Sequence, residues 1–559
     1  MKTRYLALLL AALMLVGLFA GCAKAPAETP ADTPTATTPT DTPVDTPADE
    51  PADVPADAPA DDKSLADIFP LAETKVYTGW AARNIEMDPN AKLQDTPAHQ
   101  WLYEQTNVLI EWDNVSENAA TEQFNLMLVS GTYPNILQSS PASYPGGLQS
   151  CIDQEILMDI SDYIEGGYAP NYQALREADD ELRKDTMLDS GAMPGFHRVL
   201  THKQNTFLGW TARADLAEEL GFNLDEVNTL DEFYELVTAY KNYGLETPCE
   251  LMSAGLDPAF MSTFGLSGAF GTSPFRQVNG QIQYSLVQPE YYDYLTTMKQ
   301  WYAEGLFDSE FHGVMGSIAL NNDIIATGQV GIFHMLATQG KLVNDLSGCG
   351  YRAVPAPILE DGATRKVAQN ASCSSRVETL MTAVTTAADD LETLIPYLDF
   401  FYSEEAYLPL NFGTEGETYF IDETGAAIYT PEFMNSEWGW VAQMRYYCAY
   451  NTMTNLFYWE SQKVGQPEEV IYAYSIWDKY YVDEYTLPTL ALTSEESETY
   501  TSSYSDISTY ASEMVLKFIL GMEELNEDSY AAYVKHIEDM GLQNCIDAYQ
   551  SAYNRYLAR

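Results

Sequence analysis

The sequence predicts an α/β protein with two domains, and three features indicate this. First, the residues from Lys75 to Gln138 read as strand, helix, strand, helix, strand within about 65 residues, which indicates a βαβαβ unit with parallel strands. Second, about 495 residues follow Ser64, too many for one core of usual size. Third, 46% of the 559 residues are apolar and 39 are tyrosines, so the chain can bury a large core.

The first 21 residues are typical of a secretory signal peptide. Lys2 and Arg4 precede an apolar run that is short for a membrane-spanning helix. The stretch Leu18-Phe-Ala-Gly-Cys22 resembles the lipobox of bacterial lipoproteins, although Phe19 stands where leucine is usual. This resemblance implies that Cys22 is acylated, for example by palmitate, and becomes the new N-terminus. An ordinary secretory signal with an incidental cysteine is the alternative.

Residues 22–65 read as a disordered linker after the acylated cysteine. They repeat Thr-Pro, Ala-Asp and Asp-Thr-Pro and contain almost no large apolar side chain. Such a segment cannot bury enough surface to offset the entropy of ordering. Its prolines favour extended conformations of about 3 Å per residue, so we expect a tether that holds the following domains outside the cell near a membrane.

Charge and cysteine spacing exclude several function classes. The formal net charge is -54, from 82 acidic and 28 basic residues, and such a field repels phosphate backbones. We therefore expect no nucleic-acid partner. The six cysteines after Cys22 contain no CxxC pair, and buried free thiols are the default interpretation. Because the six histidines are also scattered, we expect no metal site and no cofactor.

The elements follow in order along the chain. The N-terminal part predicts a strand at 75–79, a helix from Pro97 behind an N-cap at Thr96, a strand at 108–112, a helix from 119 that ends at Gly131, and a strand at 135–138. The later part predicts strands at 206–210, 329–333 and 380–384, and helices at 211–220, 230–243, 390–403, from Pro289 to Gly305, and through the C-terminal tail.

Ligands in parallel α/β sheets bind beyond the carboxyl ends of the strands. In the βαβαβ unit these ends fall at Trp80 and at Gln138 and Ser139, with Tyr144 shortly after. We therefore take these four residues as candidates for a binding site.

Many short sequence segments of the chain, in the same order, are similar to those of family 1 extracellular solute-binding proteins, in particular the lipoprotein branch that serves sugar-importing ABC transporters. The segments are Trp101-Leu-Tyr-Glu-Gln-Thr-Asn107, Phe124-Asn-Leu-Met-Leu-Val-Ser-Gly131, Tyr133-Pro-Asn-Ile136, Pro289-Glu-Tyr-Tyr-Asp-Tyr-Leu295, Tyr302-Ala-Glu-Gly-Leu-Phe-Asp308, Ile325-Ala-Thr-Gly-Gln-Val-Gly331, Tyr397-Leu-Asp-Phe-Phe-Tyr-Ser-Glu-Glu405, Asn411-Phe-Gly-Thr-Glu-Gly-Glu417 and Gln550-Ser-Ala-Tyr-Asn-Arg-Tyr556. Departures occur at Asn135, at Thr211-Ala-Arg-Ala-Asp215 and at His334-Met-Leu-Ala337.

The resemblance implies a periplasmic-binding-protein-like fold of two α/β lobes with parallel-type sheets, flanking helices and a hinge of crossing segments. Lobe 1 would comprise 66–205 plus 377–430, and lobe 2 would comprise 206–376 plus 431–559. A ligand that touches both lobes would shift the population toward a closed state. The implied protein is a monomer on a lipid anchor that binds a carbohydrate and delivers it to the permease subunits of an ABC transporter.

A sugar presents hydroxyl groups at its edges and C–H groups on its faces, which planar polar side chains and aromatic rings can bind. The candidate ligand-binding residues are Trp80, Gln138, Ser139, Tyr144, Trp210, Arg213, His334, Glu415, Trp438, Trp440 and Trp459. For each tryptophan, packing in a core is the alternative interpretation, and for His334 it is a hydrogen-bonded structural histidine.

Other functions stay open at this point. A glycoside hydrolase needs two carboxylates across a bond, and Glu415 and Glu417 lie in a glycine-containing loop. However, the sequence has no G-x-S-x-G, H-E-x-x-H or P-loop motif, so we expect a protein without catalytic residues. Binding of a peptide or another polar solute, and presentation of a ligand to a sensor, are further alternatives.

Overall fold

The computed structural model describes residues 68–559, apart from 84, 89, 204–205, 253–256, 269–272, 312–321, 368–374 and 481. They belong to one compact unit that begins at Lys63. The predicted signal peptide, the lipidation site Cys22 and the linker to residue 65 lie outside the described residues, as do His312 and Cys373.

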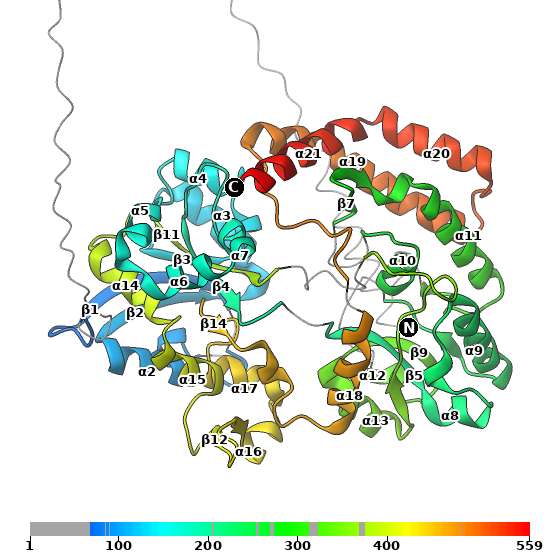
Figure 1. Cartoon of the computed structure of the whole chain (residues 1–559), viewed down its shortest axis with the longest axis horizontal. Coiled ribbons are helices and arrows are strands. Elements are labelled where there is room, and N and C mark those ends of the chain that lie inside the picture. Colours follow the sequence, from blue (N-terminus) through cyan, green and yellow to red (C-terminus); the bar gives the residue numbers. More distant parts are fainter. Residues whose placement is uncertain are drawn as a thin grey trace, which may run out of the picture. The chain divides into compact units, whose positions relative to one another are not determined.

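The first of two main sheets has six strands. These are β1 (Lys75–Ala82), β2 (Val108–Val115), β3 (Ile136–Ser139), β4 (Gly195–Leu200), β11 (Val377–Val384) and β14 (Leu456–Phe457). They lie in the order β14-β4-β11-β3-β1-β2 (Figure 1). Strand β1 runs parallel to β2 and β3, as the βαβαβ pattern predicts, whereas β11 runs antiparallel to both of its neighbours.

The second main sheet has four strands in the order β10-β5-β9-β6. They are β5 (Leu208–Arg213), β6 (Thr247–Cys249), β9 (Val330–Leu336) and β10 (Tyr351–Ala353). Only β6 and β9 are parallel, and β5 is antiparallel to both neighbours, so this sheet is mixed. Two hairpins complete the strands: β7 (Phe275–Val278) with β8 (Gln281–Tyr284), and β12 (Tyr419–Ile421) with β13 (Ala427–Tyr429).

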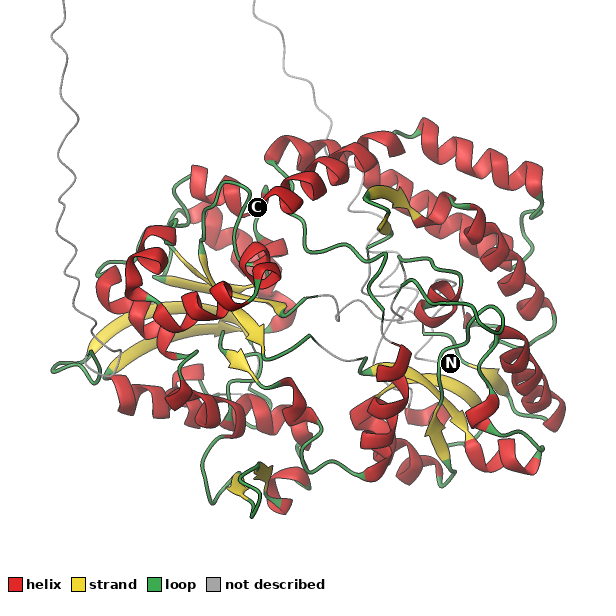
Figure 2. Cartoon of the chain, in the orientation of Figure 1, coloured by secondary structure: helices red, strands yellow, loops and turns green. Residues whose placement is uncertain are grey.

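Helices flank both sheets, as Figure 2 shows. In the part of the chain around the first sheet they are α2 (Pro97–Thr106), α3 (Ala120–Ser130), α4 (Gly147–Asp153), α5 (Ser161–Tyr163), α6 (Pro170–Ala178), α7 (Asp180–Asp185), α14 (Leu391–Phe400), α15 (Glu404–Phe412), α16 (Pro431–Met434) and α17 (Gly439–Tyr447). The others are α8 (Ala214–Glu219), α9 (Leu230–Tyr243), α10 (Pro258–Thr263), α11 (Pro289–Ala303), α12 (Asn322–Ile325), α13 (Gly340–Ser347), α18 (Glu468–Trp477), α19 (Ser494–Ile519), α20 (Glu527–Asp539) and α21 (Leu542–Ala558).

The local signals at helix ends explain several of these bounds. Thr229 and Glu232 form a reciprocal capping box at the start of α9, which satisfies two free N–H groups of its first turn. Gly131 ends α3 with a φ of 68°, a conformation that glycine adopts at little cost. Thr96 precedes Pro97 at the start of α2 as predicted, but its hydroxyl group donates to the Leu93 carbonyl oxygen at 2.8 Å instead of capping the helix.

Each main sheet has its own buried core. Tyr77, Leu102 and Ile110 belong to the core of the first sheet. Trp210 belongs to the core of the second sheet, which extends to α11, α19, α20 and α21. The rings of Trp210 and Phe233 pack edge to face with centroids 5.4 Å apart. The described chain therefore has two main sheets, each with helices around it and a buried core of its own.

One expected boundary differs in the structure. Residues 431–465 were expected in the second lobe, but α17 contacts α2 and α15, and β14 pairs with β4 in the first sheet. The reason is a buried cluster in which Trp440, Phe457 and Trp459 pack with Phe412 and Leu200. The chain therefore returns to the first sheet after β13 and leaves it again before α18.

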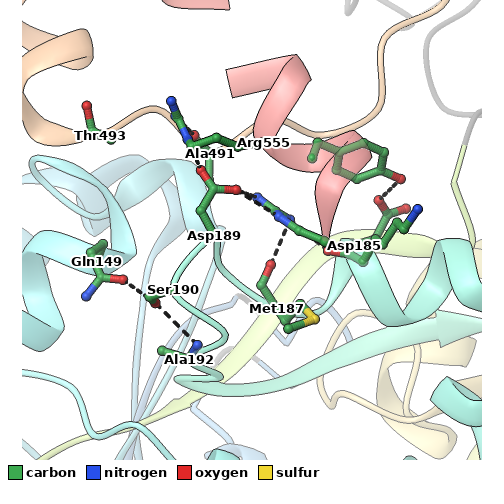
Figure 3. A network of polar contacts seen from close by, with 12 residues as sticks. Gln149, Asp185, Met187, Asp189, Ser190, Ala192, Ala491, Thr493 and Arg555 are labelled. Carbon is green, nitrogen blue, oxygen red and sulfur yellow. Dashed lines mark hydrogen bonds and ion pairs between the residues drawn. The ribbon is translucent and has the colours of Figure 1, made fainter. Parts of the chain in front are cut away.

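The C-terminal helix is fastened to the loop before β4. Figure 3 shows Asp189 of this loop facing Arg555 of α21. Asp189 accepts hydrogen bonds from Arg555 Nε at 2.5 Å and from Arg559 Nε and Nη2 at 2.8 and 2.6 Å. Arg559 Nη1 also donates to the carbonyl oxygens of Lys184 and Met187, each at 2.7 Å. We call Asp189, Arg555 and Arg559 the C-terminal clasp.

Candidate functional site

A pocket of about 620 Å³ lies at the edge of the first sheet where the parallel strands β1, β2 and β3 end. Seventeen residues line it: Trp80, Ala82, Arg83, Glu117, Ala120, Thr121, Phe124, Asn125, Gln138, Ser139, Ser140, Ala142, Ser143, Glu378, Thr379, Leu380 and Asn451. We call it the strand-end pocket. It contains three of the predicted binding residues, namely Trp80, Gln138 and Ser139.

The order of elements explains why these side chains meet. Trp80 and Gln138 lie near the ends of β1 and β3, which are neighbours in the sheet, and Trp80 pairs in register with Leu137. Glu117 follows β2 on the other side of β1. Parallel strands bring their carboxyl ends to one edge, and the loops that leave them surround a depression there. The N-terminal end of the antiparallel strand β11 reaches the same edge and adds Glu378.

Aromatic rings form one wall of the strand-end pocket. The ring centroids of Trp80 and Phe124 are 5.2 Å apart, and Tyr144 packs edge to face behind Phe124, also at 5.2 Å. Tyr144 is 3% exposed and is not a lining residue, and burial raises the pKa of its hydroxyl group. Trp80 is 5% exposed, so it is at once a core residue and a lining residue.

The Gln138 side chain is buried, with 2% of its surface exposed. Its Nε2 donates to the Thr452 carbonyl oxygen at 3.0 Å, whereas its Oε1 has no hydrogen-bond partner among the described residues. A buried amide oxygen without a partner costs free energy, about 1–3 kcal/mol for a typical group.

Two ion pairs position the charged groups. Arg83 Nη1 lies 3.1 Å from Glu117 Oε1, and Arg83 Nε donates to the Asn451 carbonyl oxygen. Burial lowers the pKa of Arg83, as does the charge of Arg445, while Glu117 opposes both effects. Arg198, whose side chain is fully buried, lies 3.0 Å from Glu378 Oε2. These contacts hold the two lining carboxylates in fixed positions without a ligand.

The predicted residues of the second sheet lie elsewhere. Trp210 is fully buried, and its ring centroid lies 3.9 Å from that of His334. His334 Nε2 lies 3.1 Å from the buried Asp257 carboxylate, which matches the alternative interpretation of a hydrogen-bonded histidine. Arg213 pairs with Asp215 at 3.3 Å and donates to the Gly328 carbonyl oxygen. The strand-end pocket contains none of these three residues.

The remaining four candidates are also apart from the pocket. Glu415 is exposed in the loop before β12, and Trp438 is 48% exposed at the start of α17. Trp440 and Trp459 are buried in the cluster that attaches β14 to the first sheet. Their rings contact Tyr450 and Phe207, respectively.

Five lining residues with a charged or amide side chain are absent from the predicted set: Arg83, Glu117, Asn125, Glu378 and Asn451. Arg83 and Glu117 follow the ends of β1 and β2 within two residues. The rule that ligands bind beyond the carboxyl ends of parallel strands, which predicts Trp80, therefore predicts these two residues as well. Asn125 projects from α3, the helix that packs over this edge. Glu378 and Asn451 have no local signal, because their positions depend on the antiparallel strand β11 and on the return of the chain before β14.

A second cavity, of about 430 Å³, lies beside α21 and is lined by Lys184, Thr486, Pro488, Tyr553, Tyr556, Leu557 and the acidic residues Asp180, Glu181, Asp483 and Glu484. It is not at the carboxyl ends of the sheet strands, so we take the strand-end pocket as the candidate site. In the described part of the chain, no three His, Cys, Asp or Glu side chains gather as a metal-ligand set. Nor does any described helix combine the length and apolarity needed to cross a membrane.

Comparison with known proteins gives one curated relative and several solved structures. No protein-family model matches the chain. The chain is 23% identical over 353 residues to lipoprotein LipO of Bacillus subtilis, a match that covers 60% of this chain and 66% of LipO, just under two thirds of that protein.

The solved structures match over a larger part of the chain. The alginate-binding protein AlgQ2 has a TM-score of 0.68 and 18% identity, covering 87% of this chain and 99% of AlgQ2. An HMO-binding solute-binding protein from Bifidobacterium longum infantis has a TM-score of 0.68 and 16% identity, covering 86% and 99%. FusA of S. pneumoniae in complex with kestose has a TM-score of 0.65 and 17% identity, covering 87% and 100%. The expected fold class is confirmed: this chain has the fold of the solute-binding proteins of ABC transporters.

Proposed function

We propose that this protein is an extracytoplasmic lipoprotein that binds an oligosaccharide in the strand-end pocket and delivers it unchanged to the permease of an ABC transporter. The lipid anchor is Cys22, and the segment to residue 65 is the tether. The proposal includes a monomeric receptor of two lobes that close on the ligand.

The observation that carries the proposal is the composition of the strand-end pocket. Trp80 and Phe124 line the pocket with ring surface on which the C–H face of a sugar can pack, and Asn125 and Asn451 offer planar amide groups to its hydroxyls. The volume of about 620 Å³ is within the range of ligand pockets. The structural neighbours support the same class, since their names give alginate, HMO and kestose as ligands.

The same neighbours are binding proteins and not enzymes, which supports a role in selective binding. Closure of two lobes on a ligand needs only that the ligand binds the closed state more tightly than the open one. If the protein delivers its ligand to a permease, deletion of its gene should abolish uptake of that ligand. If uptake persists while a transcriptional response to the sugar is lost, the protein serves a sensor instead.

A thermal-shift screen against a panel of oligosaccharides tests the ligand class. A bound ligand raises the apparent melting temperature by mass action, and at 100 times its Kd the stabilisation is about 2.7 kcal/mol. We expect a shift with at least one oligosaccharide. A flat response to every sugar together with a shift for peptides would contradict the proposal.

Two matched variants on α3 test the location of the site. Asn125 and Gln123 are both exposed on this helix, but only Asn125 lines the pocket. Loss of one hydrogen bond costs about 0.5–1.5 kcal/mol, so Asn125→Ala should weaken binding by about 2- to 10-fold. Gln123→Ala should leave the Kd unchanged. Equal effects of the two variants would place the site elsewhere.

A further inference from the structure

The charged groups of the strand-end pocket bear on which saccharides it accepts, an inference that rests on the proposed function. Among its described lining residues the charged side chains are one guanidinium, on Arg83, and two carboxylates, on Glu117 and Glu378. The surface that faces a ligand therefore carries more negative than positive charge.

The Arg83 guanidinium already has its partners. It pairs with the Glu117 carboxylate at 3.1 Å, and its Nε donates to the Asn451 carbonyl oxygen. An anionic ligand that approaches Arg83 would have to compete with a carboxylate already in place. That competition removes most of the gain from the new ion pair.

The Arg198 guanidinium is also engaged, and it lies behind the pocket. It pairs with Glu378 at 3.0 Å, and its Nη1 donates to the Asn451 side-chain oxygen. Its flat face lies on the rings of Phe457 and Tyr450, at 4.1 and 4.8 Å from their centroids. Its side chain is fully buried and is not among the lining residues, so it serves to fix Glu378.

A third guanidinium near Arg83, that of Arg445, pairs with Glu86. Each of the three arginines around the pocket thus has a carboxylate partner. Anionic sugars would bring their own carboxylate next to Glu117 and Glu378, into a partly buried site in which every arginine among the described residues named above is already paired. Juxtaposed like charges disfavour a partner by several kcal/mol in well-formed interfaces. The net charge of -54 also repels anionic sugars.

We propose that the strand-end pocket selects uncharged oligosaccharides and rejects those with carboxylates, the uronic acids. Glu117 and Glu378 then serve two purposes. They accept hydrogen bonds from the hydroxyl groups of a neutral sugar, and they repel the C6 carboxylate of its oxidised counterpart.

Calorimetric titrations with matched pairs of trisaccharides test this selectivity. Each pair has the same sugar, linkage and length, and differs only in a C6 carboxylate or a C6 hydroxymethyl group: galacturonate, glucuronate and mannuronate trimers and their carboxyl-reduced forms. In any pair that binds, the neutral member should bind at least about 10-fold more tightly at low salt. The ratio should shrink at 1 M salt, where the Debye length is about 3 Å.

Charge variants give a second readout. Glu117→Gln should reduce the ratio of neutral to acidic affinity, because it frees the Arg83 guanidinium. Glu111→Gln is the matched control, since Glu111 is exposed on β2 and does not line the pocket, and it should leave the ratio unchanged. Because Glu117 is exposed, the Glu117→Gln variant should fold as the parent protein does.

The outcomes separate this inference from the proposed function. If an acidic trimer binds as tightly as its neutral partner, or more tightly, the selectivity is wrong while carbohydrate binding stands. If the two Gln variants change the ratio equally, the assigned role of Glu117 is wrong. If neither these pairs nor any oligosaccharide of the wider panel binds, both proposals are overturned.

Discussion

Asp189→Ala should destabilise the protein by removing the acceptor of the C-terminal clasp. The carboxylate takes part in three hydrogen bonds of 2.5 to 2.8 Å, with Arg555 and with Arg559. The Arg559 side chain is 5% exposed and that of Asp189 is 20% exposed. Breaking a buried ion pair costs roughly 3–5 kcal/mol and breaking an exposed pair about 0–1 kcal/mol. Because Arg559 keeps two carbonyl acceptors and Arg555 keeps Glu496, we expect a loss of about 2–3 kcal/mol.

Urea unfolding followed by tryptophan fluorescence measures this loss. For a slope of about 3 kcal/mol per M, the midpoint should fall by about 0.7–1 M. Asp539→Ala is the matched control, because Asp539 pairs with Lys535 at 2.9 Å but is 62% exposed. The control should leave the midpoint unchanged. A midpoint for Asp189→Ala that equals the control would refute the view that the clasp stabilises the fold.

Two further predictions concern packing and pH. Gly209→Ala should cost about 1–3 kcal/mol, because the new Cβ would lie 2.4 Å from Cε2 of Trp477, whereas Gly166→Ala, with its nearest contact at 3.9 Å, should cost less in the same urea assay. Burial, and secondarily the charge of Asp308, raises the pKa of Glu250 to about 7. The folded state therefore holds this proton more tightly than the unfolded state, so the contribution of Glu250 to stability is present below about pH 4.3 and is lost as the pH rises through 7. Between pH 5 and 8 the melting temperature of Glu250→Gln should fall about 2–4 °C less than that of the parent. Identical pH profiles would contradict this.

The parts of the fold and of the site that the sequence predicts are those built from consecutive segments of the chain. The βαβαβ unit could be predicted because its strands are consecutive and parallel, which places Trp80, Gln138 and Ser139 at one edge by a general rule. The structure brings these three residues together in the strand-end pocket. Their role as sugar contacts stays a prediction until binding is measured.

The other parts of the fold and of the site depend on the pairing of strands that are distant in sequence, which the periodicity of the sequence cannot show. Trp210 occupies the end of an apolar stretch much as Trp80 does, but β5 lies between two antiparallel neighbours and its tryptophan packs into the core. Glu378 reaches the pocket because β11 runs against β3. Asn451 lines the pocket because the chain on either side of it packs against the first sheet through the aromatic cluster of Trp440 and Trp459. The pairing of β11 with β3 and the contact of Asn451 with Arg83 each join residues more than 200 positions apart.

Calorimetric titration of the purified protein with the oligosaccharide panel, followed by mass spectrometry of the recovered sugar, tests the central claim most directly. We expect saturable binding of at least one oligosaccharide at one site per chain, a weaker affinity in Asn125→Ala, and recovery of the sugar intact. Absence of binding across the panel, or recovery of shortened sugars, would contradict a receptor that binds a saccharide in the strand-end pocket without altering it.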